Sequence, residues 1–130
     1  MPRVSAAFFA TGVVCVLIGM LWGMHMGETN DFSLAPAHAH LNLVGWVTMA
    51  LYGTFYALTR DTLSTRLAWI NFVFALLGGL IMIPSLTLFL STSDSKLIPV
   101  MIVGEVLTVL GMLVFALAVF RELVRSRSSN

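Results

Sequence analysis

The sequence predicts an all-α membrane protein with four transmembrane helices, and three observations support this fold class. Hydrophobic residues make up 58% of the 130 residues and charged residues only 10%, which leaves too little polar surface for a soluble domain of this size. The apolar residues fall into four runs, each long enough to cross the hydrocarbon core of a bilayer as a helix. Almost all of the charged residues lie between or beyond these runs.

The four runs place the membrane spans at about 4–26, 37–59, 67–90 and 97–120, in a four-helix bundle that forms a single domain over 1–130. The first run follows Arg3 as in a signal peptide, but its apolar stretch is longer than a signal peptide's, so we expect a retained helix. Pro36 suits the first turn of the second helix, where its missing N–H costs nothing. Short loops that contain charged residues separate the second, third and fourth runs.

The basic residues predict the orientation of the bundle. One side of the membrane receives six arginines and the other side one lysine: Arg3, Arg60, Arg66, Arg121, Arg125 and Arg127 against Lys96. The positive-inside rule therefore predicts that both termini are cytoplasmic. A net charge of only +1 gives no indication of a nucleic-acid partner, and the lone Cys15 cannot form an intrachain disulfide.

All three histidines fall at the predicted outer end of the bundle. His25 ends the first span, whereas His38 and His40 begin the second. Histidine is costly in a membrane unless it is paired, and neutral imidazole is a ligand for haem iron, copper or zinc. The alternative is a solvated or hydrogen-bonded ring, which for His25 means a side chain that caps the helix and faces water.

The spacing of the polar residues in the second span separates their roles. Successive residues of an α-helix turn by about 100°, so His38 and His40 point about 200° apart. One metal ion is therefore hard for both to hold, and we expect them to serve two different sites. His38 and Asn42 lie four residues apart and stack on one face of the helix.

Glu105 is the only acidic residue deep in a predicted span. Side chains in a helix lean toward its N-terminus, so Glu105 leans toward the level of the histidines. Its functional interpretation is a proton relay or a group that orients a ligand or cofactor. Its structural interpretation is an interhelical hydrogen bond to Asn42 or Thr48, and the sequence leaves both open.

Two further patterns concern the first span. Gly19, Gly23 and Gly27 recur every four residues, which lets another helix or a flat cofactor approach the backbone closely. Methionines at positions 20, 24 and 26 flank His25. Because thioether sulfur suits Cu(I), this pattern favours copper as an alternative to haem, although methionine also fills cores.

The stretch AHAHLNLVGWVTMALYGTFY resembles a haem-ligating helix of subunit I in the haem–copper oxidase and nitric oxide reductase superfamily. The positions similar to the second helix of the reductases are His40, Asn42, Leu43, Trp46, Gly53 and Tyr56. His38-Ala39-His40 is similar to the His-x-His of the oxidases' tenth helix, whose two histidines ligate two different haems. Subunit I contains three four-helix arcs, so the resemblance implies that this chain corresponds to one arc and forms a homotrimer, with haem between neighbouring arcs.

The resemblance implies a bacterial inner-membrane protein that binds haem b through His40, with histidines near the periplasmic face. The second axial ligand is expected to be His25 of the same chain or His38 of a neighbouring one, with Asn42 beside the cofactor. The expected role is electron transfer with a redox partner protein or quinone, or haem-linked sensing.

Enzyme activity is not expected, because the family's copper-ligating histidines are absent from the third span, 67–90. Two alternatives belong to other functional classes. One is a copper- or zinc-binding protein or assembly factor that uses His25, His38 and His40. The other is a structural membrane protein that has kept the four-helix arc and lost its cofactor. Contact with membrane lipid is expected in each case.

Overall fold

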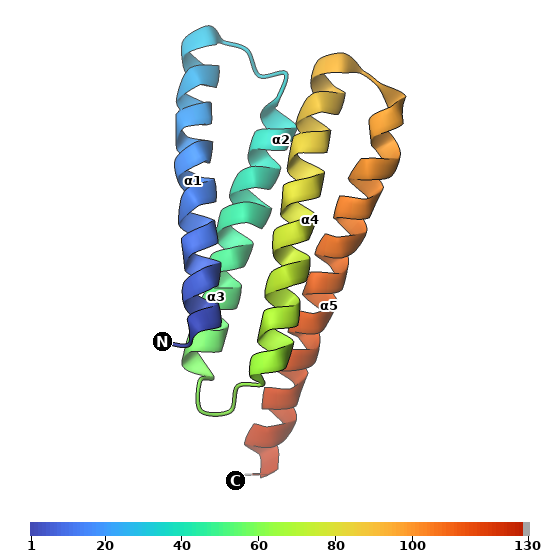
Figure 1. Cartoon of the computed structure of the whole chain (residues 1–130). Helices are drawn as coiled ribbons and strands as arrows, with labels where there is room; N and C mark the ends of the chain where they lie inside the picture. The colour runs from blue at the N-terminus through green and yellow to red at the C-terminus, as the bar shows by residue number, and fades with distance from the viewer. Residues whose placement is uncertain (129–130) are drawn as a thin grey trace.

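The computed structural model describes residues 1–128, with side chains described through Arg125, and residues 129–130 of the predicted domain lie outside the described part. Within it the chain is an up–down–up–down bundle with both termini at the same end (Figure 1). Four of its helical segments are long and apolar enough to cross a membrane. The prediction of an all-helical protein with four spans is therefore confirmed.

The first span is a single helix, α1 (Arg3–Thr29). The second consists of α2 (Ala35–His40), the π-helix η1 (Leu41–Thr48) and α3 (Met49–Leu58), which follow one another without a break. The third is α4 (Thr65–Thr92), and a short 3₁₀ turn, η2 (Ser95–Leu97), leads into α5 (Ile98–Ser128). The last helix continues eight residues beyond its predicted end at 120, so the arginine-rich tail is helical up to residue 128.

The α-helical geometry expected throughout the second span is wrong for Leu41–Thr48. In this π-helical segment the hydroxyl of Thr48 donates to the carbonyl of Leu43, five residues back, at 2.8 Å. A turn closed over five residues holds more residues than an α-turn, so side chains four apart, such as Asn42 and Trp46, come more nearly into line. Asn42 and Trp46 both pack on glycines of α1, and this packing favours the alignment. The local sequence does not indicate a π-helix.

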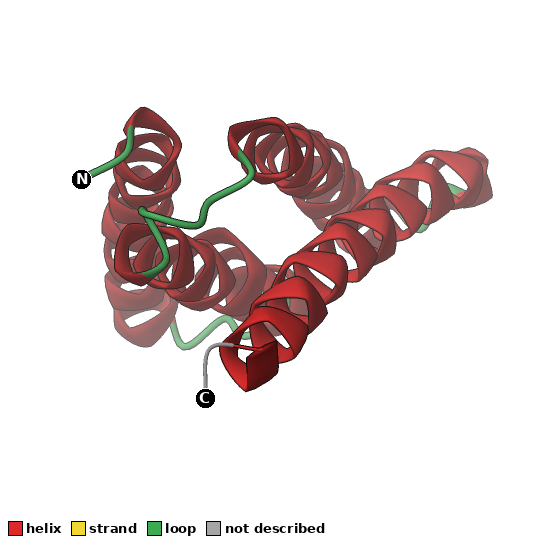
Figure 2. Cartoon of the chain, turned by 90° about the horizontal axis from the view of Figure 1, so that it is seen from below, coloured by secondary structure: helices red, strands yellow, loops and turns green. Residues whose placement is uncertain are grey.

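The bundle consists of two helical hairpins, α1 with the second span and α4 with α5 (Figure 2). In the second hairpin, glycines bring the two backbones together. A Cβ added at Gly104 would lie 2.7 Å from the Cα of Met82, and one added at Gly78 would lie 2.8 Å from the backbone nitrogen of Thr108. Close approach through small residues is the usual way in which membrane helices associate.

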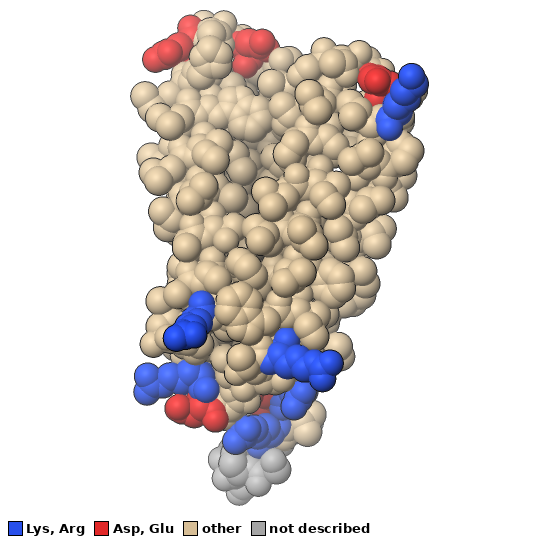
Figure 3. All heavy atoms as spheres, in the orientation of Figure 1, with Lys and Arg blue, Asp and Glu red and all other residues tan. Residues whose placement is uncertain are grey.

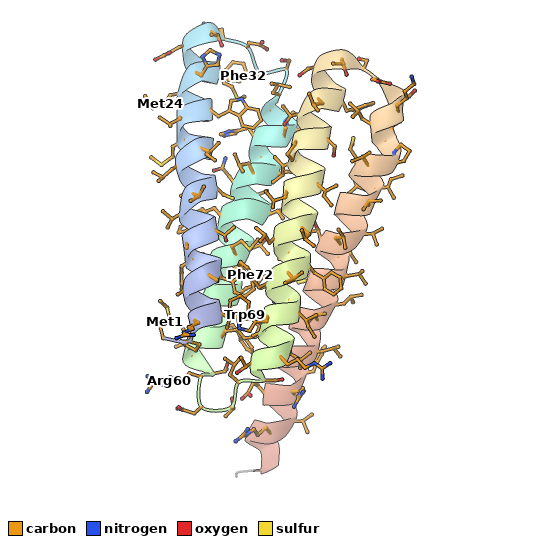
Figure 4. The ribbon with its side chains drawn as sticks, viewed as in Figure 1. Met1, Met24, Phe32, Arg60, Trp69 and Phe72 are labelled. Carbon is orange, nitrogen blue, oxygen red and sulfur yellow. The ribbon has the colours of Figure 1, made fainter. Side chains whose placement is uncertain are left out.

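An aromatic core joins the two hairpins at the end that carries the termini. Phe8 of α1 is fully buried, and its ring centroid lies 5.5 Å from that of Tyr52 and 5.1 Å from that of Phe72. Phe115 of α5 stacks within 4.5 Å of Tyr52. Phe72 lies in this half of the bundle, whereas Met24 and Phe32 lie at the opposite end (Figure 4). The four spans are thus fixed together at one end of the molecule.

The two ends of the bundle differ in charge, as the positions of the basic residues in the sequence predict (Figure 3). Lys and Arg side chains gather at the end with the termini, and the opposite end carries acidic groups together with Lys96 of η2. The positive-inside rule uses a charge difference of this kind to predict orientation.

Candidate functional site

A ridge of three side chains from the second span fills the glycine-lined face of α1. Each side chain packs on one glycine: His38 on Gly23, Asn42 on Gly19 and Trp46 on Gly12. A Cβ added at Gly23 would lie 3.2 Å from Cε1 of His38, and one added at Gly12 would lie 3.0 Å from Cε3 of Trp46. The small-residue face of α1 is therefore occupied by the second span, which leaves Gly27 as the member of the series with nothing within 4 Å of its Cβ position.

Asn42 selects the tautomer of the neutral His38 ring. Its Nδ2 lies 2.9 Å from the backbone carbonyl oxygen of His38 and 3.2 Å from Nε2 of the same residue. Because a carbonyl oxygen only accepts, the amide must present its N–H groups here, and Nε2 accepts the second hydrogen bond. The neutral ring then carries its proton on Nδ1, which is buried with no partner among the described residues. In this arrangement the lone pair of His38 is engaged by Asn42.

Trp22 encloses the His38 ring from α1. The two ring centroids lie 5.9 Å apart with their planes at 85°, an edge-on contact. The stacking of His38 and Asn42 predicted from their spacing is thus confirmed. Gly23 and Trp22 of α1 lie against His38. In the sequence, the only indication of this contact was the small-residue spacing of the first span.

His40 points away from this ridge and is exposed on the surface of the isolated chain. Its Nδ1 lies 2.8 Å from the carbonyl oxygen of Pro36, one turn back. A carbonyl can only accept, so Nδ1 carries the proton and the neutral ring presents a lone pair on Nε2. Metal-ligating histidines have this arrangement, in which a hydrogen bond from one nitrogen fixes the tautomer and the ring orientation while the other nitrogen binds.

His25 lies at the end of α1 and is also exposed. The nearby loop carboxyl of Asp31 accepts a hydrogen bond from the backbone N–H of Ser33 at 2.9 Å. Hydrogen bonds from Ser33, and to a smaller extent the charge of His25, hold the pKa of Asp31 below its usual value. The loop between the first two spans therefore keeps a negative charge beside His25.

The described part of the chain holds no group of three His, Cys, Asp or Glu side chains able to share a metal ion. His25, His38 and His40 lie at one end of the bundle but face different directions. Within a single chain this geometry gives no support to a copper or zinc site built from all three histidines.

Glu105 is exposed on α5, and no hydrogen bond or ion pair involves it among the described residues. The two groups considered as its hydrogen-bond partners have other partners: Asn42 binds His38, and the hydroxyl of Thr48 donates to the carbonyl of Leu43. The described chain therefore leaves a mid-span carboxyl exposed, with no bonding partner among its residues.

An apolar groove of about 560 Å³ lies between α1, the second span and α4. Cys15, Leu41, Gly45 and Leu80 are among the residues that line it, and no histidine does. A porphyrin in this groove would have no axial histidine from the same chain. His40 lies outside this groove, on the outer surface of the bundle.

At this site, Nε2 of His40 has no hydrogen bond within the described chain, whereas Nε2 of His38 is hydrogen-bonded to Asn42. The His40 nitrogen is thus the one available to a group that approaches from outside the chain. The hydrogen bond from Nδ1 of His40 to the carbonyl of Pro36 could in principle be predicted from the sequence, because residues four apart in a helix stack. No family model matches the chain, and no curated protein and no solved structure matches it significantly.

Proposed function

We propose that the protein binds haem b in the membrane, with His40 as an axial ligand and the haem between two copies of the chain. The observation that carries this proposal is the His40 ring, whose Nδ1–H is tied to the carbonyl of Pro36 while Nε2 is free on the outer surface of the bundle. Haem iron bound there would supply one-electron redox chemistry. The role is electron transfer or haem-linked sensing, with a quinone or a redox protein as partner.

The second axial ligand comes from a neighbouring copy in this proposal. His38 packs against α1, and His40 points to another side of the second span, so α1 of the same chain is on the wrong side to supply His25. His25 of a neighbour is exposed and lies at a matching depth. It precedes the end of α1 by four residues, about 6 Å, and His40 follows the start of α2 by five residues, about 8 Å.

An assembly of this kind is head-to-tail, because two different surfaces of the chain meet. Head-to-tail contacts close into rings when the rotation allows it. A ring of three copies would contain twelve helices, the number in subunit I of the haem–copper oxidase superfamily, one arc of which this chain resembles. The homotrimer is therefore the assembly we propose.

The proposed location is the bacterial inner membrane. The basic end with both termini would lie in the cytoplasm and the histidines near the periplasmic face. His38 and Asn42 would remain inside the protomer, packed against α1.

Absorption spectra of the detergent-purified protein after haem supplementation test the ligand assignment. We expect a Soret band from the wild type and loss of most bound haem in His40→Ala. His38→Ala, two residues away on the other face, is the matched control and should keep the band. Absence of haem binding by the wild type, or an identical spectrum in His40→Ala, would refute the proposal and favour a structural protein without cofactor.

A further inference from the structure

α5 is the least buried of the four spanning segments, and its exposed surface carries an ionisable residue, which is unusual for a helix in contact with lipid alone. Only 11% of its most apolar 18-residue window is buried in the chain, against 28% for α1 and for α4. Within this exposed surface lies Glu105, seven residues or about 10 Å below the start of the helix. An ionisable side chain that faces hydrocarbon is costly, and such residues face a protein partner or a water-filled cavity.

The direction of Glu105 follows from a neighbour on the same helix. Met112 lies two turns further along α5, on nearly the same face, and its sulfur accepts a hydrogen bond from Tyr52 of α3 at 3.6 Å. Glu105 therefore faces the same side of α5 as the second span. Toward the end of the bundle that carries the α4–α5 loop, α4 lies between α2 and α5 (Figure 1), and α2 packs against α4.

We infer that the face of α5 around Glu105 is a subunit interface, which packs on α1 of a second copy and brings the Glu105 carboxyl to that copy's His25. Both residues are exposed, and no described residue bonds to Glu105. A carboxyl and an imidazole are complementary partners, the first an acceptor and the second a donor.

The depths of the two side chains also match. His25 lies about 6 Å from the outer end of α1, and its side chain leans inward, toward the N-terminus of that helix. Glu105 lies about 10 Å from the outer end of α5 and leans outward, because α5 runs in the opposite direction. The two side chains thus converge on one level when α5 and α1 of different copies lie side by side.

This contact rests on the assembly in the proposed function but not on haem. If His25 ligates haem iron through one ring nitrogen, a carboxyl on the other nitrogen would fix its orientation, as carboxylates do for many metal-ligating histidines. Glu105 is then a positioning residue. The interface can therefore be tested on protein without haem, where failure of haem ligation has no effect on the result.

The first experiment measures self-association without haem in detergent or bicelles, for example by sedimentation. Glu105→Leu and His25→Leu should each raise the dissociation constant at least tenfold, and Glu105→Gln, which keeps a hydrogen-bonding group, should have a smaller effect. The double variant with Glu105→His and His25→Glu restores the pair in reverse and should recover most of the association. A monomeric wild type, or unchanged association in both leucine variants, would overturn the inference.

The second experiment locates the interface by disulfide crosslinking in a Cys15→Ala background. Val109→Cys, one turn deeper in the membrane than Glu105, is combined with Leu21→Cys, one turn deeper than His25, on two differently tagged copies. We expect a crosslink between copies for this pair. The matched control replaces Leu21→Cys with Leu80→Cys, which is also exposed and deep in its span but lies on α4, and should give none. Equal crosslinking to Leu80→Cys would exclude the assignment of α1 as the partner helix.

Discussion

The two hairpins of the bundle use glycine for different purposes. In the hairpin of α4 and α5, Gly104 faces the backbone of Met82. In the hairpin of α1 and the second span, Gly19 and Gly23 face the side chains of Asn42 and His38. The first arrangement holds two helices at minimal separation, and the second makes room for polar groups inside a membrane bundle.

The difference predicts how each hairpin responds to an added side chain. A backbone cannot move without shifting the whole helix, whereas the end of a side chain can rotate at the cost of its hydrogen bonds. Substitutions in the second hairpin should therefore cost stability, and those in the first should alter the state of a histidine. The following variants test this distinction, from the largest expected effect to the smallest.

Gly104→Val should be the most damaging substitution. Its Cβ would lie 2.7 Å from the Cα of Met82, so α4 and α5 must separate, at a cost of about 3 kcal/mol. Reversible unfolding in bicelles measures this loss. The control is Gly27→Val, where the Cβ position has no neighbour within 4 Å. Equal stability of the two variants would remove the basis of the comparison.

Gly78→Ala and Gly79→Ala give a matched pair on one helix. The Cβ at Gly78 would lie 2.8 Å from the backbone nitrogen of Thr108, whereas the Cβ at Gly79 would meet only Cδ1 of Ile83 at 3.9 Å. We expect Gly78→Ala to lose about 2 kcal/mol from overpacking. Gly79→Ala should be neutral or gain up to about 1 kcal/mol from helix propensity. The same unfolding assay should rank the two variants, and the reverse order would contradict the packing.

Gly19→Ala should cost less than Gly78→Ala, because the group that it meets is the amide of Asn42. Displacing this amide breaks two hydrogen bonds to His38, worth about 1 kcal/mol together at the values typical of membrane proteins. The decisive readout is the His38 tautomer, measured by NMR with ¹⁵N-labelled histidine. We expect Nδ1–H in the wild type and a loss of this preference in Gly19→Ala and Asn42→Leu. An unchanged tautomer in both would show that Asn42 does not control the ring.

Asp31→Asn should have the smallest effect, confined to acidic pH. Because hydrogen bonds from Ser33 lower the pKa of Asp31 in the folded protein, the stabilising contribution is present above the unfolded value near 3.8 and is lost as the pH falls through the lower folded value. Unfolding measured between pH 5 and about pH 2 should therefore be slightly less pH-dependent in Asp31→Asn. Identical profiles would mean that the loop is already open in solution.

Local patterns in the sequence predicted more of the fold than of the site. The four spans follow from apolar runs of bilayer length, and the stacking of His38 on Asn42 follows from the helical repeat. The sequence left open a hydrogen bond from Glu105 to Asn42 or Thr48. It is absent among the described residues, where Asn42 and Thr48 both bond within their own span. Contacts of this kind depend on which helix faces which, and periodicity alone does not contain that information.

The sequence by itself determined the number of spans, the polarity of the ends and the opposite directions of His38 and His40, since these depend on hydrophobicity, charge and the turn of a helix. Only the tertiary structure decided that Asn42 and His38 are held by glycines of α1, that Leu41–Thr48 is π-helical and that Glu105 is left uncovered. The physical reason is that these features arise from packing between helices, where the shape of one partner selects the conformation of the other.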